Sequence, residues 1–541
     1  MAVNWFRFGT ECRGRAALVS TRRLAVMLAR IAALLALLAL TAGSYSHVRA
    51  QQPKVRSQRG FDLQASIYTV LNANRVHCGL HALGRVCYDY SGLSGARWPR
   101  TTRDTYIFNS GLQIAALIPV DAGFEWAGDT TGVFLMDPRG HQAAGSPLMG
   151  FVDSQNPFDL AEWPSEAVVR RMPPAAGLPD TSVYHELLLG RSVVSEQDAW
   201  VRIWDGDASI RGGREHPLGV LIELRAMAFN GPSGNEDIVY LVYTLYNITA
   251  SDPAAYQHLD PAISDGIAAI GQQFHDEVSA ELGVELPAGG YRFEEMHAAV
   301  YMDPDIADYS GNYSTANLPL RTAMAYNADF VEQTWSYPPE IFGPPFRPNT
   351  GIVGAAFLGT PDRAGLTIFS NIANTSIGFH DPIGVAQLWR YISGNLSPAA
   401  GDNDCSFPNP KERQLCWLYD QQHDTRFQQS TGPFTLDPGE FTTFTMAYVF
   451  AAPVADALVA SGGIGGDLKP LIPFPGDSIF NNTCSDPGGL PIPCIRAIDS
   501  VAGWVSESDL DGDGVIEGHE IQTVPRSFLH KAQIAQAFFD N

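Results

Sequence analysis

Residues 238–247, Ile-Val-Tyr-Leu-Val-Tyr-Thr-Leu-Tyr-Asn, constrain the fold more than any other stretch of the chain. Most of them are aromatic or β-branched, a composition that fits the pleated, half-buried surface of a β-strand. A second apolar run covers 220–229, and residues 231–237 between the two runs are rich in Gly, Pro, Ser and Asn. Turn-forming residues between two strand-like runs predict an antiparallel hairpin.

Further strand-like runs recur along the chain, over 106–118, 291–302, 321–326, 352–358, 366–372 and 441–451. Residues 254–285 interrupt them, because Ile267, Ile270 and Phe274 belong to an apolar series with helical spacing. A second short helix is predicted at 385–395. The sequence therefore predicts a mainly β protein of antiparallel β-sandwich architecture, with a helical insert near 256–285.

Residues 509–520 have the spacing of a twelve-residue calcium loop. Aspartates at positions 1, 3 and 5 converge on one centre, and a glycine at position 6 permits the sharp turn. Position 7 supplies a backbone carbonyl, position 9 acts through a water, and the glutamate at position 12 supplies two oxygens. The predicted ligands are Asp509, Asp511, Asp513, Val515, Glu517 and Glu520. Hard oxygen ligands in this number favour Ca²⁺ over Mg²⁺ and Zn²⁺.

This loop resembles those of the EF-hand family, over the twelve residues and their flanks only. The resemblance implies calcium as a cofactor and implies no reaction. Pro525 stops a long helix leaving the loop, and Ser527 predicts the cap of a new helix over 528–539. We expect a small α-helical calcium-binding segment over 495–541. A single loop without a paired second loop favours a structural role for the ion.

The N-terminal residues 1–50 have the pattern of a signal peptide. Arginines precede an apolar run over 31–42, and Val48-Arg49-Ala50 supplies a cleavage signature. The run is too short to span a bilayer comfortably, and no later segment is long and apolar enough to do so. We therefore expect a protein that is secreted, periplasmic or at the cell surface, and not transmembrane after signal removal.

The net charge limits the classes of partner. It is −23 for the whole chain, and −29 once the seven Arg and one Glu of residues 1–50 are left out. An excess of acid argues against nucleic acid and anionic membranes as partners, because both need basic patches. It favours cation binding.

Six cysteines follow the signal segment and form three local couples. Six cysteines allow fifteen pairings, and the sequential pairing closes the shortest loops. The predicted disulfides are Cys78 with Cys87, Cys405 with Cys416, and Cys484 with Cys494. No C-x-x-C spacing supports the alternative of a zinc cluster.

These patterns divide the chain into five segments. They are a signal peptide over 1–50, a lead-in with a local disulfide over 51–94, the β-sandwich region with its helical insert over 95–460, a Gly/Pro-rich linker with a disulfide over 461–494, and the EF-hand-like segment over 495–541.

Asp303, Asp305 and Asp308 end a predicted strand and offer three carboxylates for a candidate second metal site. The alternative is an acidic turn stiffened by Pro304. Asp205-Gly206-Asp207 is a weaker candidate of the same kind.

Catalytic signatures are absent from the sequence. Glu295 and His297 can share one face of a strand, whereas a glycosidase needs two carboxylates facing each other across a cleft. His185-Glu186 lacks the second histidine of a zinc protease motif, and no nucleophile elbow, P-loop or dinucleotide fingerprint is present. We predict a non-enzymatic, secreted or cell-surface calcium-binding protein. The alternative is a carbohydrate-active protein that binds or hydrolyses glycans, and an extracellular glycan or protein is the further partner to consider.

Several short motifs flank the predicted strands: Trp98-Pro99, His216-Pro217-Leu218-Gly219, Tyr243 to Thr249, Asp303-Pro304-Asp305, Gly432-Pro433-Phe434 and Pro438-Gly439. Through them the chain resembles a set of uncharacterised secreted bacterial proteins over much of residues 95–540. The resemblance implies a secreted or surface protein without a known activity. Such proteins often carry further C-terminal modules.

Overall fold

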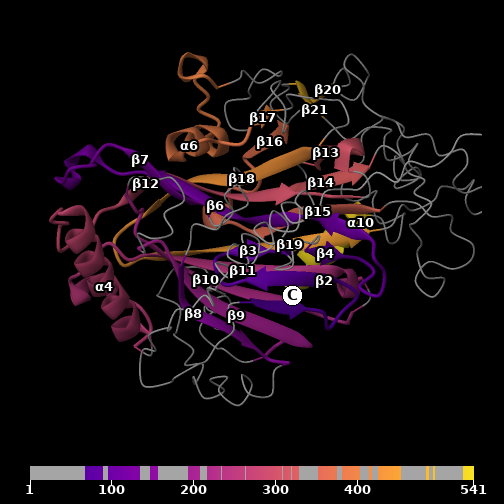
Figure 1. The fold of residues 1–541 in the computed structure, drawn as a ribbon, viewed down its shortest axis with the longest axis horizontal. Coiled ribbons are helices and arrows are strands. Elements are labelled where there is room, and N and C mark those ends of the chain that lie inside the picture. The colour runs from indigo at the N-terminus through magenta and orange to yellow at the C-terminus, as the bar shows by residue number, and fades with distance from the viewer. Residues whose placement is uncertain are drawn as a thin grey trace, which may run out of the picture. The chain divides into compact units, whose positions relative to one another are not determined.

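A computed structural model describes residues 68–88, 95–134, 146–155, 193–206, 216–232, 234–261, 263–306, 309–317, 320–327, 351–373, 380–402, 414–416, 424–451, 483–485, 491–493 and 528–541. In these residues the chain forms two large sheets, one small hairpin and three α-helices (Figure 1). The prediction of a mainly β fold with antiparallel sheets, a helical insert and a C-terminal helix is confirmed.

The larger sheet has eleven strands: β1 (Tyr68–Leu71), β2 (His77–His81), β3 (Arg85–Val86), β4 (Ala96–Arg97), β5 (Thr105–Ile107), β6 (Asn109–Leu117), β7 (Thr130–Phe134), β12 (Phe293–Asp303), β16 (Ile368–Ala373), β17 (Gln414–Cys416) and β18 (Thr425–Leu436). Its main path runs β17-β16-β18-β12-β6-β3-β2-β4-β5. Every pair is antiparallel except β16 with β17. β12 therefore lies between β18 and β6, two strands that are far from it in the sequence.

The smaller sheet has eight strands: β8 (Ser146–Asp153), β9 (Gln197–Trp204), β10 (Val220–Ala228), β11 (Ile238–Asn247), β13 (Asn312–Asn317), β14 (Thr322–Asn327), β15 (Ile352–Gly359) and β19 (Phe441–Ala451). Their order is β13-β14-β15-β19-β11-β10-β9-β8. β10 and β11 form the predicted hairpin, with Val220 opposite Asn247. A separate hairpin pairs β20 (Thr483–Ser485) with β21 (Pro491–Pro493).

The two large sheets share one apolar core. Val300 and Met302 on β12 of the larger sheet belong to the same buried cluster as Leu241, Tyr243 and Phe444 of the smaller sheet. Alternate residues of a strand face opposite sides of a sheet, so these side chains mark the two inner faces. This arrangement is sandwich-like, and it leaves the outer face of each sheet to be covered by other elements.

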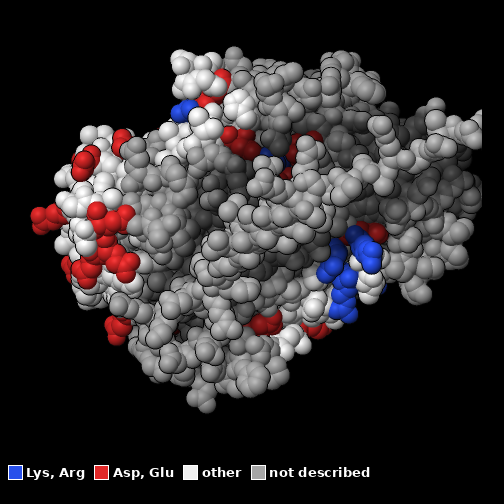
Figure 2. Space-filling model, viewed as in Figure 1, with Lys and Arg blue, Asp and Glu red and all other residues white. Residues whose placement is uncertain are grey.

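The helical insert forms α4 (Ser264–Leu282), at one end of the two sheets (Figure 1). Its buried side chains, Ile267, Ile270, Phe274 and Val278, join the common core. Its exposed side carries a cluster of acidic residues, which are Asp265, Asp276, Glu277 and Glu281 (Figure 2). α4 is thus an amphipathic helix whose acidic face is in solvent.

Two further α-helices cover outer faces. α6 (Val385–Ser393) packs Leu388 and Ile392 against Ala115 and Ala299 of the larger sheet. α10 (Phe528–Asp540) packs on β15 and β19 of the smaller sheet. β15 has glycines where α10 approaches, because a Cβ at Gly354 or Gly359 would lie 2.7 Å from the ring of Phe528 or Phe539.

A buried ion pair holds α10 on the sheet. Lys531 is 2% exposed, and its Nζ donates to Asp237 Oδ2 at 2.8 Å and to the carbonyl of Phe450 at 3.0 Å. Asp237 also accepts a hydrogen bond of 2.8 Å from the indole N–H of Trp98. α10 is therefore fixed to β19 of the smaller sheet and to Asp237 of η3, and its lysine lies over the ring of Trp98, the residue after β4.

Three short 3₁₀ helices connect strands or precede α4: η1 (Val120–Ala122), η3 (Asn235–Asp237) and η4 (Pro253–Tyr256). Three more, η5 (Tyr309–Gly311), η6 (Pro361–Arg363) and η7 (Pro398–Ala400), lie in later loops. Among the described residues, no helix is long and apolar enough to cross a membrane.

The predicted disulfide between Cys78 and Cys87 is present. In the other two couples Cys405 and Cys494 lie outside the described residues, so their disulfides remain predictions.

Candidate metal centre

Three aspartates lie together at one end of two inner strands of the larger sheet, where β12 ends and β18 begins. Asp303 is the last residue of β12, and Pro304 follows, which has no N–H to continue the ladder. Asp305 remains beside the sheet because its N–H donates to the carbonyl of Tyr106 at 3.0 Å. Asp424 directly precedes β18, and antiparallel pairing places the start of β18 beside the end of β12.

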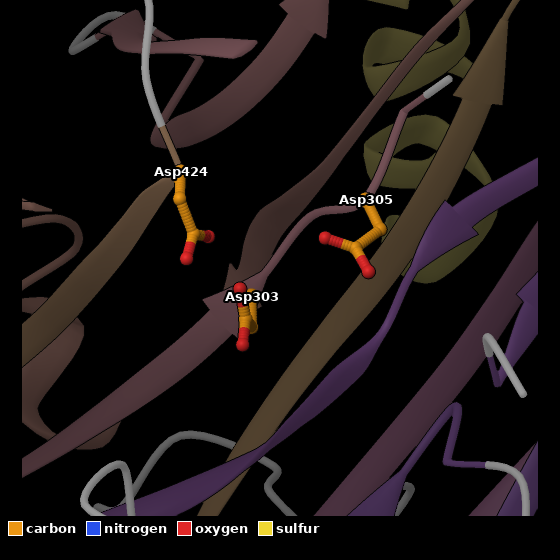
Figure 3. Close-up of side chains that lie close together, drawn as sticks. All are labelled: Asp303, Asp305 and Asp424. Carbon is orange, nitrogen blue, oxygen red and sulfur yellow. The ribbon is translucent and has the colours of Figure 1, made fainter. Parts of the chain in front are cut away.

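The three carboxyl groups lie within reach of a single ion. Oxygens of Asp303, Asp305 and Asp424 all fall within 4.8 Å of one another. In Figure 3 the carboxyl groups of Asp305 and Asp424 approach that of Asp303 from either side. Asp303 is 2% exposed, and the other two are partly buried. The group is therefore a buried set of oxygen ligands that could hold a metal ion.

One arginine lies against this cluster. Arg426 is 5% exposed, with its Nε 3.2 Å from Asp303 Oδ2 and its Nη2 3.6 Å from Asp424 Oδ2. Its Nη1 is 2.6 Å from an oxygen of Asp381, whose other oxygen accepts from the hydroxyl of Tyr301 at 2.9 Å. Three carboxylates thus contact one guanidinium, and a single positive charge leaves most of their mutual repulsion uncompensated.

The crowding of carboxylates changes their proton affinity. Burial raises the pKa of Asp303 well above its ordinary value, against the opposing effect of Arg426. Burial, followed by the charge of Asp424, raises the pKa of Asp305 from 3.8 to about 6. Both carboxyl groups resist ionisation without a further cation, because the charged forms are poorly solvated and repel one another. A bound divalent ion would remove that resistance.

Two of these three aspartates belong to the candidate metal site predicted from the sequence, which stays a prediction. Asp303 and Asp305 meet as expected, whereas Asp308 lies outside the described residues. The third member is Asp424, which the sequence prediction missed. Its signal was the Asp-x-Arg at 424–426 at the start of a strand, but only the pairing of β12 with β18 places it here.

The predicted calcium loop lies outside the described residues. None of its predicted ligands, from Asp509 to Glu520, falls within them. The nearest described element in the sequence is α10. The calcium-loop prediction therefore stays a prediction from sequence.

Asp205, the described aspartate of the weaker metal candidate at 205–207, bonds to the backbone of a turn. The carboxylate of Asp205 accepts hydrogen bonds from the backbone N–H groups of Leu218, Gly219 and Val220, at 2.6, 3.1 and 2.9 Å. Asp207 lies outside the described residues. Asp205 fixes the turn before β10, and its oxygens are already used by the backbone.

The interpretation that Glu295 and His297 share a face is wrong. A β-bulge shifts the register between Glu294 and His297, and Glu295 has a positive φ of 45°. Glu295 is consequently exposed while His297 is 3% exposed, with its Nδ1 at 2.9 Å from the carbonyl of Glu295. Strict alternation fails here because the bulge adds a residue to the strand.

Comparison with protein-family models and with curated proteins finds no match for this chain. The resemblances to EF-hand loops and to secreted bacterial proteins thus have no support from these comparisons. The aspartate cluster and the residues around it are the features of the described chain that point to a function.

Proposed function

We propose that the protein is an exported, non-enzymatic calcium-binding protein in which the ion stabilises the β fold. The observation that carries the proposal is the cluster of Asp303, Asp305 and Asp424, whose oxygens lie within 4.8 Å of one another. A sandwich-like fold has no structural need for three adjacent carboxylates, which are destabilising when they are ionised without a cation.

The chemistry of the donors favours calcium. All three are carboxylates, the ligands of hard cations, and the cluster contains no imidazole or thiolate. Calcium binds oxygens at about 2.3–2.6 Å, so two ligands on opposite sides of the ion lie up to about 5 Å apart. Magnesium has shorter bonds, needs a near-ideal octahedron and keeps several waters.

Two features outside the cluster support the proposal. The sequence of 509–520 supplies a complete second set of calcium ligands, seven residues before α10 begins. The disulfide between Cys78 and Cys87 suits an oxidising compartment, as the signal-like segment over 1–50 also does. Extracellular calcium is millimolar, so even weak sites would be filled there.

Calcium titration of the chelator-stripped exported chain by calorimetry tests the proposal. The centre variant carries Asp305→Asn and Asp424→Asn, and the loop variant carries Asp509→Asn and Glu520→Gln. We expect the parent protein to show two classes of calcium site. The centre variant should lose the site at the aspartate cluster, and the loop variant should lose the site at 509–520.

The matched control replaces two exposed aspartates of α4, Asp265 and Asp276, by asparagine. It changes the net charge as much as the centre variant does and should leave both sites intact. Calcium binding by the centre variant identical to that of the parent would rule out the aspartate cluster, and no uptake by the parent would end the proposal.

The carbohydrate-active alternative stays a prediction from sequence. No observation on the described residues favours it specifically.

A further inference from the structure

Asn109 presents a buried amide next to the aspartate cluster. It is the first residue of β6 and is 0% exposed. Neither its Oδ1 nor its Nδ2 has a hydrogen-bond partner in the described part of the chain. Buried side-chain amides in folded proteins nearly always have partners, so this one calls for an explanation.

The register of the sheet places this amide beside Asp303. Asn109 on β6 is the direct cross-strand partner of Asp303 on β12. Directly opposed residues of an antiparallel pair project to the same face, with Cβ atoms about 4.5–5.5 Å apart. Because β12 lies between β18 and β6, Asn109 flanks Asp303 on the side away from Arg426.

The backbone around Asn109 is fixed against both aspartates. The N–H of Phe108 donates to the carbonyl of Asp303 at 2.9 Å, and the N–H of Asp305 donates to the carbonyl of Tyr106 at 3.0 Å. The expected strand over 106–118 is divided at Phe108 into β5 and β6. The first side chain of β6 is thereby held at the edge where the carboxylates meet.

From this geometry we propose that Asn109 is the fourth protein ligand of the calcium centre, binding the ion through Oδ1 together with Asp303, Asp305 and Asp424. The inference rests on the proposed function. Asparagine carbonyl oxygens are common calcium ligands, and a bound ion would satisfy an acceptor that has no partner among the described residues.

Charge balance explains why the fourth ligand is neutral. Asp303, Asp305, Asp424 and Asp381 carry four negative charges when ionised, and Arg426 carries one positive charge. A bound divalent cation reduces the net charge of the site to a single negative charge. A fourth ligating carboxylate would make the net charge of this buried site more negative again, whereas an amide adds an oxygen ligand without charge.

The test replaces the amide by an apolar side chain of similar size, Asn109→Leu. Both parent and variant carry the loop substitutions Asp509→Asn and Glu520→Gln, so that calorimetry reads the aspartate centre alone. We expect Asn109→Leu to weaken calcium binding at least tenfold. In excess EDTA it should unfold at the same urea concentration as the parent or a higher one, because the variant loses only a polar group that has no partner in the described part of the chain.

The control is Asn235→Leu, a second buried asparagine outside the cluster whose Oδ1 accepts from the hydroxyl of Tyr240. It should lower stability in EDTA and leave calcium affinity unchanged. A second variant, Asn109→Asp, retains an oxygen ligand and should retain binding. Asn109→Asp also tests the inference if Asn109→Leu does not fold.

The outcomes separate the two proposals. A parent that binds no calcium at this centre refutes the proposed cluster itself. A parent that binds, with Asn109→Leu binding equally well, refutes only the role of Asn109. Loss of stability in EDTA with unchanged affinity assigns the asparagine a structural role and likewise overturns the inference. If Asn109→Leu does not fold and Asn109→Asp binds no calcium, the inference is also refuted.

Discussion

Replacing Lys531 by methionine should release α10 from the smaller sheet. The lysine is 2% exposed, and its ammonium contacts Asp237 at 2.8 Å and the ring of Trp98, whose centroid is 5.2 Å away. Methionine fills much of the same volume but leaves the Asp237 carboxylate buried without its main cation. Breaking a buried ion pair from one side typically lowers the free energy of unfolding by about 3–5 kcal/mol.

The expected loss lies at the lower end of that range, at about 3 kcal/mol, because Asp237 keeps two partners. The indole N–H of Trp98 still donates to it, and Arg75 lies 3.6 Å away with its side chain 38% exposed. Replacing both members of the pair, Lys531→Met with Asp237→Asn, should cost less than the sum of the single changes. We expect a coupling energy of about 2 kcal/mol.

Urea unfolding in excess calcium gives the free energies, and hydrogen exchange over 528–540 reports whether the helix is docked. Asp540→Asn, an exposed change on the same helix, is the control. Unfolding of Lys531→Met within about 0.5 kcal/mol of the parent, the range of ordinary surface changes, would refute the assignment of Lys531 as the anchor of α10.

Three further predictions follow from individual contacts. In the calcium-free protein the pKa of Asp305 is about 6, so Asp305 carries a proton in the folded protein at low pH. As the pH rises from about 4 to 7 in EDTA, the free energy of unfolding of the parent should therefore fall by up to about 3 kcal/mol relative to that of Asp305→Asn, measured by urea unfolding. If the difference in free energy of unfolding between the parent and Asp305→Asn did not change with pH, the raised pKa would be contradicted. Replacing Cys78 and Cys87 by serine together should lower stability by about 2.5 kcal/mol from loop-closure entropy, and a thiol count on the unfolded parent checks that the bond forms. Asp205→Asn should lower stability by about 2 kcal/mol, because the amide replaces only part of a carboxylate that accepts three backbone N–H groups; no change in urea unfolding would oppose this role.

The sequence predicts the elements best where local pattern and packing agree. Both 238–247 and 441–451 are observed at the predicted boundaries, as β11 and β19. They pair with each other at the centre of the smaller sheet, so their apolar residues are buried as the pattern requires. α10 begins directly after the predicted cap at Ser527.

The prediction is incomplete where geometry depends on distant partners. Asp424 joins Asp303 only through the pairing of β12 with β18, and more than a hundred residues separate them. Asn109 is an ordinary residue in its own sequence context. That its amide lies opposite Asp303 without a hydrogen-bond partner among the described residues follows only from the pairing of β6 with β12. The bulge at Glu295 has no local signal, because any strand pattern assumes an unbroken alternation.

The two proposed calcium sites should affect stability in different ways. An ion at the aspartate centre would join β12 to the loop after it and to the start of β18, and through Asn109 also to β6. β6, β12 and β18 are far apart in sequence, so such a crosslink closes long loops of the unfolded chain and should raise the stability of the whole fold. The loop over 509–520 would join only neighbours within twelve residues, and an ion bound there would order a short segment. Loss of the centre should therefore shift global unfolding, whereas loss of the loop site should change hydrogen exchange near α10 alone.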